Sequence, residues 1–169
     1  GIAGLTAAVL RRGTEAHSAQ EINVALDNVG ASLDFGAGRN SMTFGGQSLA
    51  ADLALLVDLL AEILMRPTFP QVELDKLRGQ VLTHLGVLQT DTGYRADRAF
   101  MTSLYPDGHP YQRSSLGTRE SLPALTPSDL QRFYQTFYHP ESLILAVSGA
   151  VRADDVVSAL ERAFSYWQV

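Results

Sequence analysis

The chain has 169 residues, of which 46% are hydrophobic and 18% charged, and its formal net charge at pH 7 is −5. This length and composition fit one globular domain with a full core. The few, scattered basic residues argue against a nucleic-acid or anionic-membrane surface, and the lack of cysteine excludes disulfides and thiolate metal sites.

A cysteine-free chain is compatible with an oxidising or a reducing environment, so the cysteine content does not determine the cellular compartment. We expect a soluble, cytoplasmic protein. The longest apolar stretch, Leu53 to Met65, is interrupted by Asp58 and Glu62. It is too short and too charged to cross a bilayer, so we expect no membrane span. The chain begins inside a helical pattern without an initiator Met, which indicates a fragment of a larger protein.

The N-terminal part predicts two helices. Residues 1–12 form an apolar helical pattern that Gly13 closes. Ser18 and Glu21 have the spacing of a capping box, and the helix that they begin runs to Gly30.

A hairpin and a long helix follow. The alternating runs 32–36 and 41–45 flank a glycine-containing turn at 38–40, which predicts two antiparallel strands. Ser48 is expected to cap an amphipathic helix that continues through Met65.

Four more helices and a strand are expected in the second half. The pattern predicts a helix over 70–90, a break at Gly93, a helix over 94–104 and a loop over 105–125. Thr126, Pro127 and Asp129 then start another helix, which His139-Pro140 ends. The apolar run 143–149 predicts a buried central strand, and a last helix runs from Asp154-Asp155 to Phe164.

The first fourteen residues, GIAGLTAAVLRRGT, resemble the segment that carries the inverted zinc motif H-x-x-E-H in the insulinase/pitrilysin/processing-peptidase family. Four residues of that family's wider pattern are retained: Gly1, Ala3, Gly13 and Thr14. The two histidine positions and the glutamate position between them hold residues without a donor atom: Gly4, Ala8 and Ala7, respectively.

Two ligands four residues apart on a helix project from one face and can bind one ion, which glycine and alanine cannot do. The family's third ligand is a glutamate on a later helix, and its position here corresponds to His84, followed by Leu85. The resemblance therefore implies a chain with no metal ligands and no catalytic residues of its own, with vacated ligand positions at Gly4, Ala7, Ala8 and His84.

The resemblance continues in the same order along the chain, in the segments His17–Ile22, Gly30–Leu33, Pro67–Phe69, His109–Tyr111, Leu116–Thr118, Tyr138–Glu141 and Leu145–Gly149. It implies an α+β fold, a mostly antiparallel sheet with helices packed on it, of the LuxS/processing-peptidase-like repeat type. Residues 1–169 would form a single domain of this type that lacks the repeat's N-terminal strands. A sheet without those strands would expose unpaired backbone and apolar surface.

For function, the resemblance implies a non-catalytic, peptide-enclosing domain or subunit of a zinc metalloendopeptidase-like protein, inactive by itself. Its partners would be peptide substrates and a zinc-bearing catalytic domain or subunit of the same family, which would hold the only zinc. The small residues Gly4, Ala7 and Ala8 would allow close approach of a neighbouring helix or a peptide. The alternative is a structural scaffold related to the core subunits of respiratory complexes, with no peptidase role.

Other patterns favour structural roles. The spacing of Arg98 and Tyr105 matches the substrate-positioning Arg…Tyr pair of the family but lacks its sequence context, so we interpret it as coincidence. Nothing in the spacing of His17, His84 and His109 supports a separate zinc site.

Overall fold

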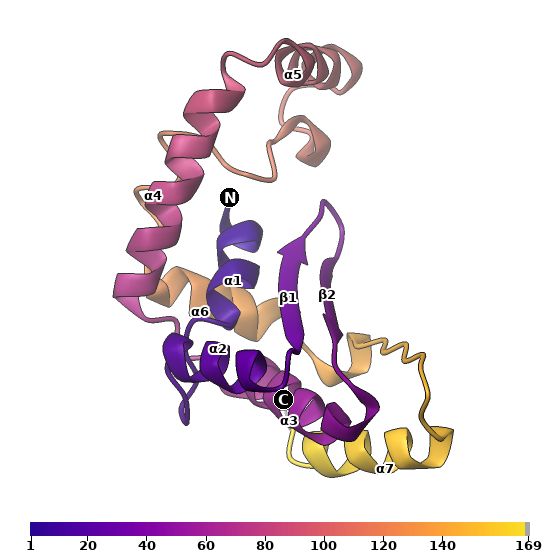
Figure 1. The fold of residues 1–169 in the computed structure, drawn as a ribbon. Coiled ribbons are helices and arrows are strands. Elements are labelled where there is room, and N and C mark those ends of the chain that lie inside the picture. The colour runs from indigo at the N-terminus through magenta and orange to yellow at the C-terminus, as the bar shows by residue number, and fades with distance from the viewer. Residues whose placement is uncertain (168–169) are drawn as a thin grey trace.

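The structure, a computed structural model, describes residues 1–167, in which helices pack along one side and one end of a single antiparallel hairpin (Figure 1). The α-helices are α1 (Ile2–Leu10), α2 (Ala19–Asn28), α3 (Leu53–Met65), α4 (Gln71–Leu88), α5 (Thr92–Leu104), α6 (Pro127–Phe137) and α7 (Ala153–Phe164). The strands are β1 (Ser32–Ala37) and β2 (Met42–Gln47). Three single 3₁₀ turns complete the elements: η1 (Ala50–Asp52), η2 (Pro110–Gln112) and η3 (Pro140–Ser142). The predicted α+β fold is confirmed.

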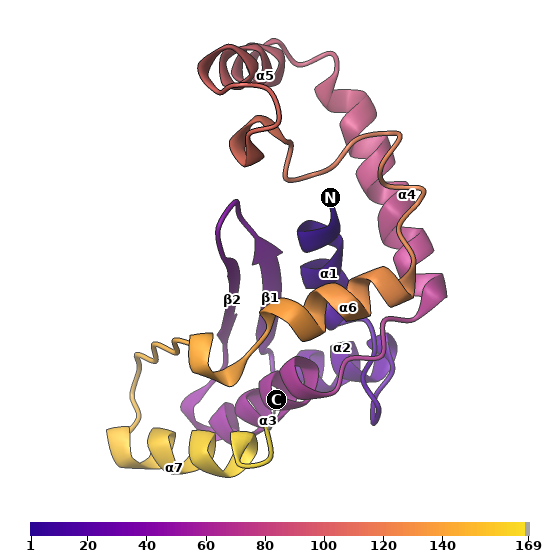
Figure 2. The same cartoon turned by 180° about the vertical axis from the view of Figure 1, so that it is seen from behind.

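Helix α1 lies at the centre of the molecule. It packs against α6, β1 and α4, and Figures 1 and 2 show α6 crossing on the side of α1 opposite to the viewer of Figure 1. Its side chains Leu5, Val9 and Leu10 belong to the main hydrophobic core, which also draws on α2, α3 and α4. The apolar character of this short helix is therefore explained by burial on three sides.

The predicted hairpin is confirmed. Strands β1 and β2 pair in antiparallel register, with Phe35 opposite Phe44, and the two rings lie 5.9 Å apart between centroids. The tight turn between them is closed by the Gly38 N–H, which donates to Ser41 O at 2.8 Å. Aromatic pairs across a hairpin stabilise the register that the turn sets.

Two of the three predicted helix caps, at Ser18 and Thr126, are confirmed in detail. The Ser18 hydroxyl accepts from the Glu21 N–H, while a Glu21 carboxylate oxygen accepts from the Ser18 N–H at 2.8 Å. Thr126 and Asp129 form the same reciprocal pair at the start of α6. These hydrogen bonds lower the pKa of the Glu21 and Asp129 carboxyls, because they favour the charged form.

Two predicted helix starts are wrong in detail. The Ser48 hydroxyl donates to the neighbouring Leu49 O at 3.0 Å and caps nothing, so the long helix begins with the 3₁₀ turn η1 and continues as α3. The break before α5 falls at Asp91, whose carboxylate accepts from the Tyr94 N–H at 2.6 Å and caps the helix. Gly93 therefore lies inside the first turn of α5.

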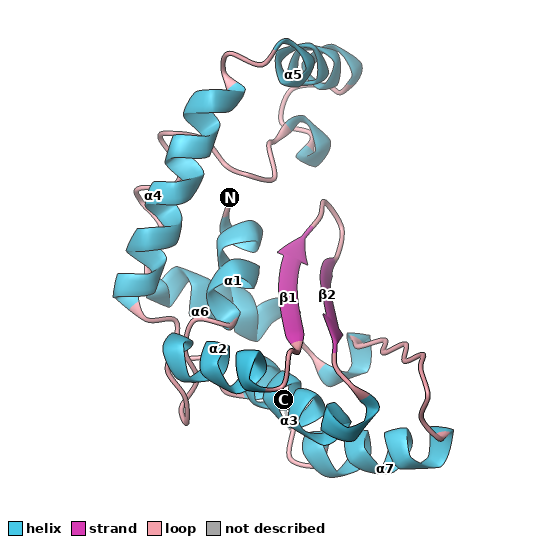
Figure 3. Cartoon of the chain, viewed as in Figure 1, coloured by secondary structure: helices cyan, strands magenta, loops and turns pink. Residues whose placement is uncertain are grey.

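The predicted central strand over residues 143–149 is also wrong for the described chain (Figure 3, where this segment is drawn as loop). Its backbone makes no ladder with the hairpin, which is the one sheet among residues 1–167, and Ile144 is 90% exposed. A continuous apolar run indicates a preference for burial on both faces, but a strand forms only where a neighbouring strand takes up its N–H and C=O groups.

Gly13 should be intolerant of a side chain, because a Cβ atom there would lie 2.9 Å from Pro70 Cγ and 3.0 Å from Thr68 Oγ1. We expect Gly13→Ala to cost about 1–3 kcal/mol of unfolding free energy, measured by urea denaturation. Gly79→Ala on α4 is the matched control, since nothing lies within 4 Å of its Cβ position, and it should gain about 0.5–1 kcal/mol. Equal stability of the two variants would contradict the close approach at Gly13.

Candidate functional site

The three vacated motif positions on α1 differ in exposure. Ala7 is fully buried, with 0% of its surface exposed, whereas Gly4 and Ala8 are half-buried. A segment that links α5 to α6 passes over the start of the helix, so that a Cβ atom added at Gly4 would lie 3.6 Å from Ser115 O. The surface that α1 still offers at these positions is therefore a narrow strip of backbone and small side chains.

The residues at these positions do not fit a zinc ion. Gly4, Ala7 and Ala8 have no donor atom, and His84 lies exposed on α4 beside the buried Leu85. Within residues 1–167, no group of three His, Cys, Asp or Glu side chains is arranged to hold a metal. The structure thus assembles no zinc site from His17, His84 and His109.

His17 has a different partner. Its Nδ1 lies 2.9 Å and 3.0 Å from the two carboxylate oxygens of Glu62 on α3, and the Thr14 hydroxyl donates to the same carboxylate. The Thr14 hydroxyl also accepts from the His17 N–H at 2.9 Å. This network fastens the loop after α1 to α3, which is a structural role.

Arg11 joins three elements and was missed by the sequence analysis. Its guanidinium donates to Leu33 O, to the Asp34 carboxylate at 3.0 Å and to Asn23 Oδ1 at 2.9 Å. The C-terminal end of α1 is thereby tied to β1 and α2. Glu62 was missed as well, because the sequence shows it only as one of two acidic residues, with Asp58, that interrupt an apolar helix.

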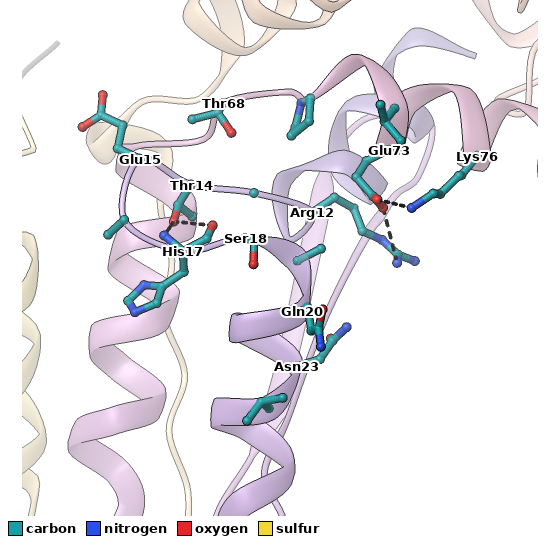
Figure 4. A pocket seen from close by; sticks show the side chains of 16 residues that line it. Arg12, Thr14, Glu15, His17, Ser18, Gln20, Asn23, Thr68, Glu73 and Lys76 are labelled. Carbon is teal, nitrogen blue, oxygen red and sulfur yellow. Dashed lines mark hydrogen bonds and ion pairs between the residues drawn. The ribbon is translucent and has the colours of Figure 1, made fainter.

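An open hollow of about 770 Å³ lies beside the loop between α1 and α2, which contains Thr14 and His17 (Figure 4). Glu73 stands at its edge, with Lys76 Nζ at 2.6 Å and an Arg12 guanidinium nitrogen at 4.0 Å from its carboxylate. The charges of the rim nearly cancel, and the walls combine hydroxyl and amide side chains with apolar ones such as Val24 and Val72. This composition gives no preference for a charged ligand.

A second hollow of about 690 Å³ is lined mainly by aromatic and aliphatic side chains, with Arg39, Asn40 and His139 among its polar residues. It is bounded by Ala3 of α1, by the hairpin, and by Phe133 and Phe137 of α6, whose rings lie 4.7 Å apart. Phe137 is more than half exposed, so its ring adds apolar surface at the edge of this hollow.

Two tyrosines of α6 and its C-terminal end are held in the protonated form. Burial raises the pKa of Tyr134 to about 12, and burial together with the neighbouring Tyr134 raises the pKa of Tyr138 to about 12. The Tyr134 hydroxyl donates to Leu64 O at 2.5 Å, which ties α6 to α3.

Alkaline pH should therefore weaken the fold. The pKa of Tyr134 lies above the ordinary value of 10.0, so unfolding releases a proton between pH 10 and about 12, and stability that is intact below pH 10 is lost as the pH rises through that range. Tyr134→Phe should cost about 0.5–1.5 kcal/mol at neutral pH and flatten the alkaline decline. Urea denaturation at a series of pH values measures both effects. Tyr166→Phe, at an 80% exposed position, is the control that should change neither.

Comparison with known proteins agrees with this architecture. Residues 1–118 match the family described as insulinase (peptidase family M16), and residues 124–169 match the peptidase M16 inactive domain. The chain is 31% identical over 158 residues to a Mycobacterium leprae protein described as an uncharacterized zinc protease, covering 92% of this chain and 35% of the relative. It is 22% identical to a probable mitochondrial-processing peptidase subunit beta of Arabidopsis thaliana, covering 91% of this chain and 29% of the relative.

A crystal structure of a peptidase M16 inactive domain from Pseudomonas fluorescens has the same fold, with a TM-score of 0.87 and 26% identity over 98% of this chain and 40% of that one. The chain belongs to the insulinase family, peptidase family M16, because that match covers most of its length. Its C-terminal part is of the inactive-domain type. The chain spans about a third of the length of the curated relatives it matches. In the described part of the chain, the helices are too short or too polar to cross a membrane.

Proposed function

We propose that this chain forms a non-catalytic wall of a peptide-binding chamber in an M16-type metallopeptidase assembly, whose zinc-bearing domain or subunit lies elsewhere. One observation carries the proposal. The residues that frame the zinc motif are retained, while the ligand positions hold Gly4, Ala7 and Ala8. A helix that keeps its fold and place but has no donor atoms can bind or position a peptide, but it cannot activate water through a metal.

Peptide contact in this proposal falls on Gly4 and Ala8. Both are half-buried and have little or no side chain, so an extended backbone can approach them closely. Ala7 was expected to share this role, but its side chain is covered within the chain itself. The outer edge of β2 offers a second contact, because an extended peptide can add to a sheet edge through backbone hydrogen bonds with little sequence preference.

The segment 143–149 supports the view that the chain works within a larger assembly. Ile144 and Val147 are 90% and 47% exposed, and residues 144–149 make no backbone hydrogen bond to the rest of the described chain. Apolar exposure of this kind is typical of a surface that another polypeptide covers. We infer that residues 1–169 are one peptidase-like domain of a larger protein or complex.

Zinc titration tests the non-catalytic part of the proposal. Calorimetry on the chain should show no stoichiometric binding of zinc at micromolar concentration, whereas tight 1:1 binding would overturn the proposal. The zinc-bearing relative that forms the other half of the assembly serves as the positive control.

Peptide binding tests the enclosing role and separates it from a scaffold role. A fluorescein-labelled, unstructured peptide should bind the complete assembly, and Gly4→Trp should weaken that binding at least about tenfold by filling the strip on α1. Gly79→Trp, on an exposed face of α4, is the control. Absence of binding to the assembly would favour the structural scaffold instead.

A further inference from the structure

Helix α5 and the turn that follows it form a unit held together by its own contacts. Arg98 Nη2 donates to Gln112 O at 2.8 Å, and the Gln112 side-chain amide donates to Tyr105 O at 3.3 Å. The Tyr105 ring stacks on His109, with centroids 4.6 Å apart. Arg98 and Tyr105 thus both serve to build this unit, residues 92–112, which we call the arm.

The arm has few contacts with the rest of the molecule. Figures 1 and 2 show α5 at the far end of α4, beyond the tip of the hairpin and away from α2, α3 and α7. No residue of α5 is buried, and among the described elements the helix packs substantially only against η2, within the arm itself. A segment with so little buried apolar surface opens more readily than the core does.

One side chain connects the arm to the hairpin. Asn40 Nδ2 donates to the Tyr111 hydroxyl at 2.7 Å, and that hydroxyl donates to Asn40 Oδ1 at 3.1 Å. Arg39 donates to Tyr111 O at 2.7 Å, and its guanidinium lies 5.7 Å from the centre of the Tyr111 ring. Within residues 1–167, the side-chain hydrogen bonds that join the arm to a distant part of the chain all run through Tyr111.

We propose that Tyr111 is a clasp, which holds the arm against the hairpin tip at Arg39 and Asn40 and thereby positions the segment that covers Gly4. That segment, residues 113–118, leads directly from the arm, and Ser115 O lies at the Gly4 surface. The clasp is made of exposed polar contacts, each weakened by competing water, so it can release while the core stays folded. The effect of the clasp on peptide access rests on the proposed function, whereas the contact between the arm and the hairpin does not depend on it.

Distance measurement between two spin labels tests the clasp. Because the chain has no cysteine, labels can be placed at Ser103→Cys on α5 and Asn28→Cys on α2, both exposed. The parent should give one narrow distance distribution. The double variant Arg39→Ala/Tyr111→Ala should broaden it and shift it to longer distances, and an unchanged distribution would overturn the proposal.

Milder variants keep the test decisive if that double variant is unstable. Asn40→Leu removes the partner of the hydroxyl and should broaden the distribution, whereas Asn40→Asp keeps an acceptor for it and should restore the parent distribution. A purely structural loss at the turn would not be rescued in this way. Tyr94→Phe on α5 is the matched control, because the described Tyr94 side chain makes no hydrogen bond, and a shift there as large as that of Asn40→Leu would also overturn the clasp.

Peptide association separates the clasp from the proposed function. In the complete assembly, Asn40→Leu should speed association of the labelled peptide by at least about threefold, since binding no longer waits for the arm to open. A changed distance distribution with an unchanged rate would confirm the clasp and overturn its role in peptide access. If no variant binds the peptide, the enclosing function is overturned. The spin-label distance distributions then decide whether the clasp exists.

Discussion

Ala7→Glu, which restores the glutamate of the zinc motif, should unfold the chain or remove most of its stability. Ala7 is 0% exposed, and the neighbouring Thr6 is a buried hydroxyl without a hydrogen-bond partner in the described chain. A carboxylate placed there would have no partner either, and an unpaired buried charge costs about 3–5 kcal/mol. Since small domains are stable by only about 5–15 kcal/mol, circular dichroism during urea denaturation should show a large loss or no transition.

Gly4→Ala on the same helix is the matched control. A Cβ atom at position 4 would lie at an ordinary contact distance of 3.6 Å from Ser115 O, so the variant should gain up to about 1 kcal/mol from helix propensity. If Ala7→Glu were as stable as Gly4→Ala, water would have to reach the inner face of α1, contrary to the packing described above. If the prediction holds, reversing the motif substitutions one by one cannot simply rebuild a zinc site in this chain.

The features that the sequence predicted well are determined by neighbours in the chain. The capping box at Ser18 and the helix start at Thr126 depend on side chains within three residues of each other, and the hairpin depends on a short turn between two alternating runs. The family resemblance likewise came from motifs in a fixed order, and the family match confirms it.

The features that the sequence could not give depend on distant partners. Arg11 is hydrogen-bonded to Leu33, and Tyr111 to Asn40, although these residues lie far apart in the sequence. A local sequence pattern cannot predict such contacts. The run 143–149 was predicted to be a strand from its own composition, but strand formation requires a neighbouring strand, and the described chain does not supply one. The same reasoning explains why the exposure of Gly4, Ala7 and Ala8 had to be read from the packing of α1.

Phe69→Ala should be among the most destabilising core truncations, and its comparison with Phe69→Gly tests the backbone at this position. The Phe69 side chain is 3% exposed, and its ring lies 5.7 Å from that of Tyr134. Loss of such a ring costs about 3–5 kcal/mol. The backbone of Phe69 has a φ of 49°, in the left-handed region, where a side chain costs about 1–2 kcal/mol.

Glycine relieves that strain, so Phe69→Gly should be at least as stable as Phe69→Ala in urea denaturation, although both are far less stable than the parent. Leu74, fully buried in α4, is the control position, where the glycine variant should be about 1 kcal/mol less stable than the alanine variant. If alanine exceeded glycine equally at both positions, the turn at Phe69 would have to relax to negative φ at no cost. The hydrogen bond from the Thr68 N–H to Gly13 O, at 3.0 Å, would then not depend on the left-handed backbone of Phe69.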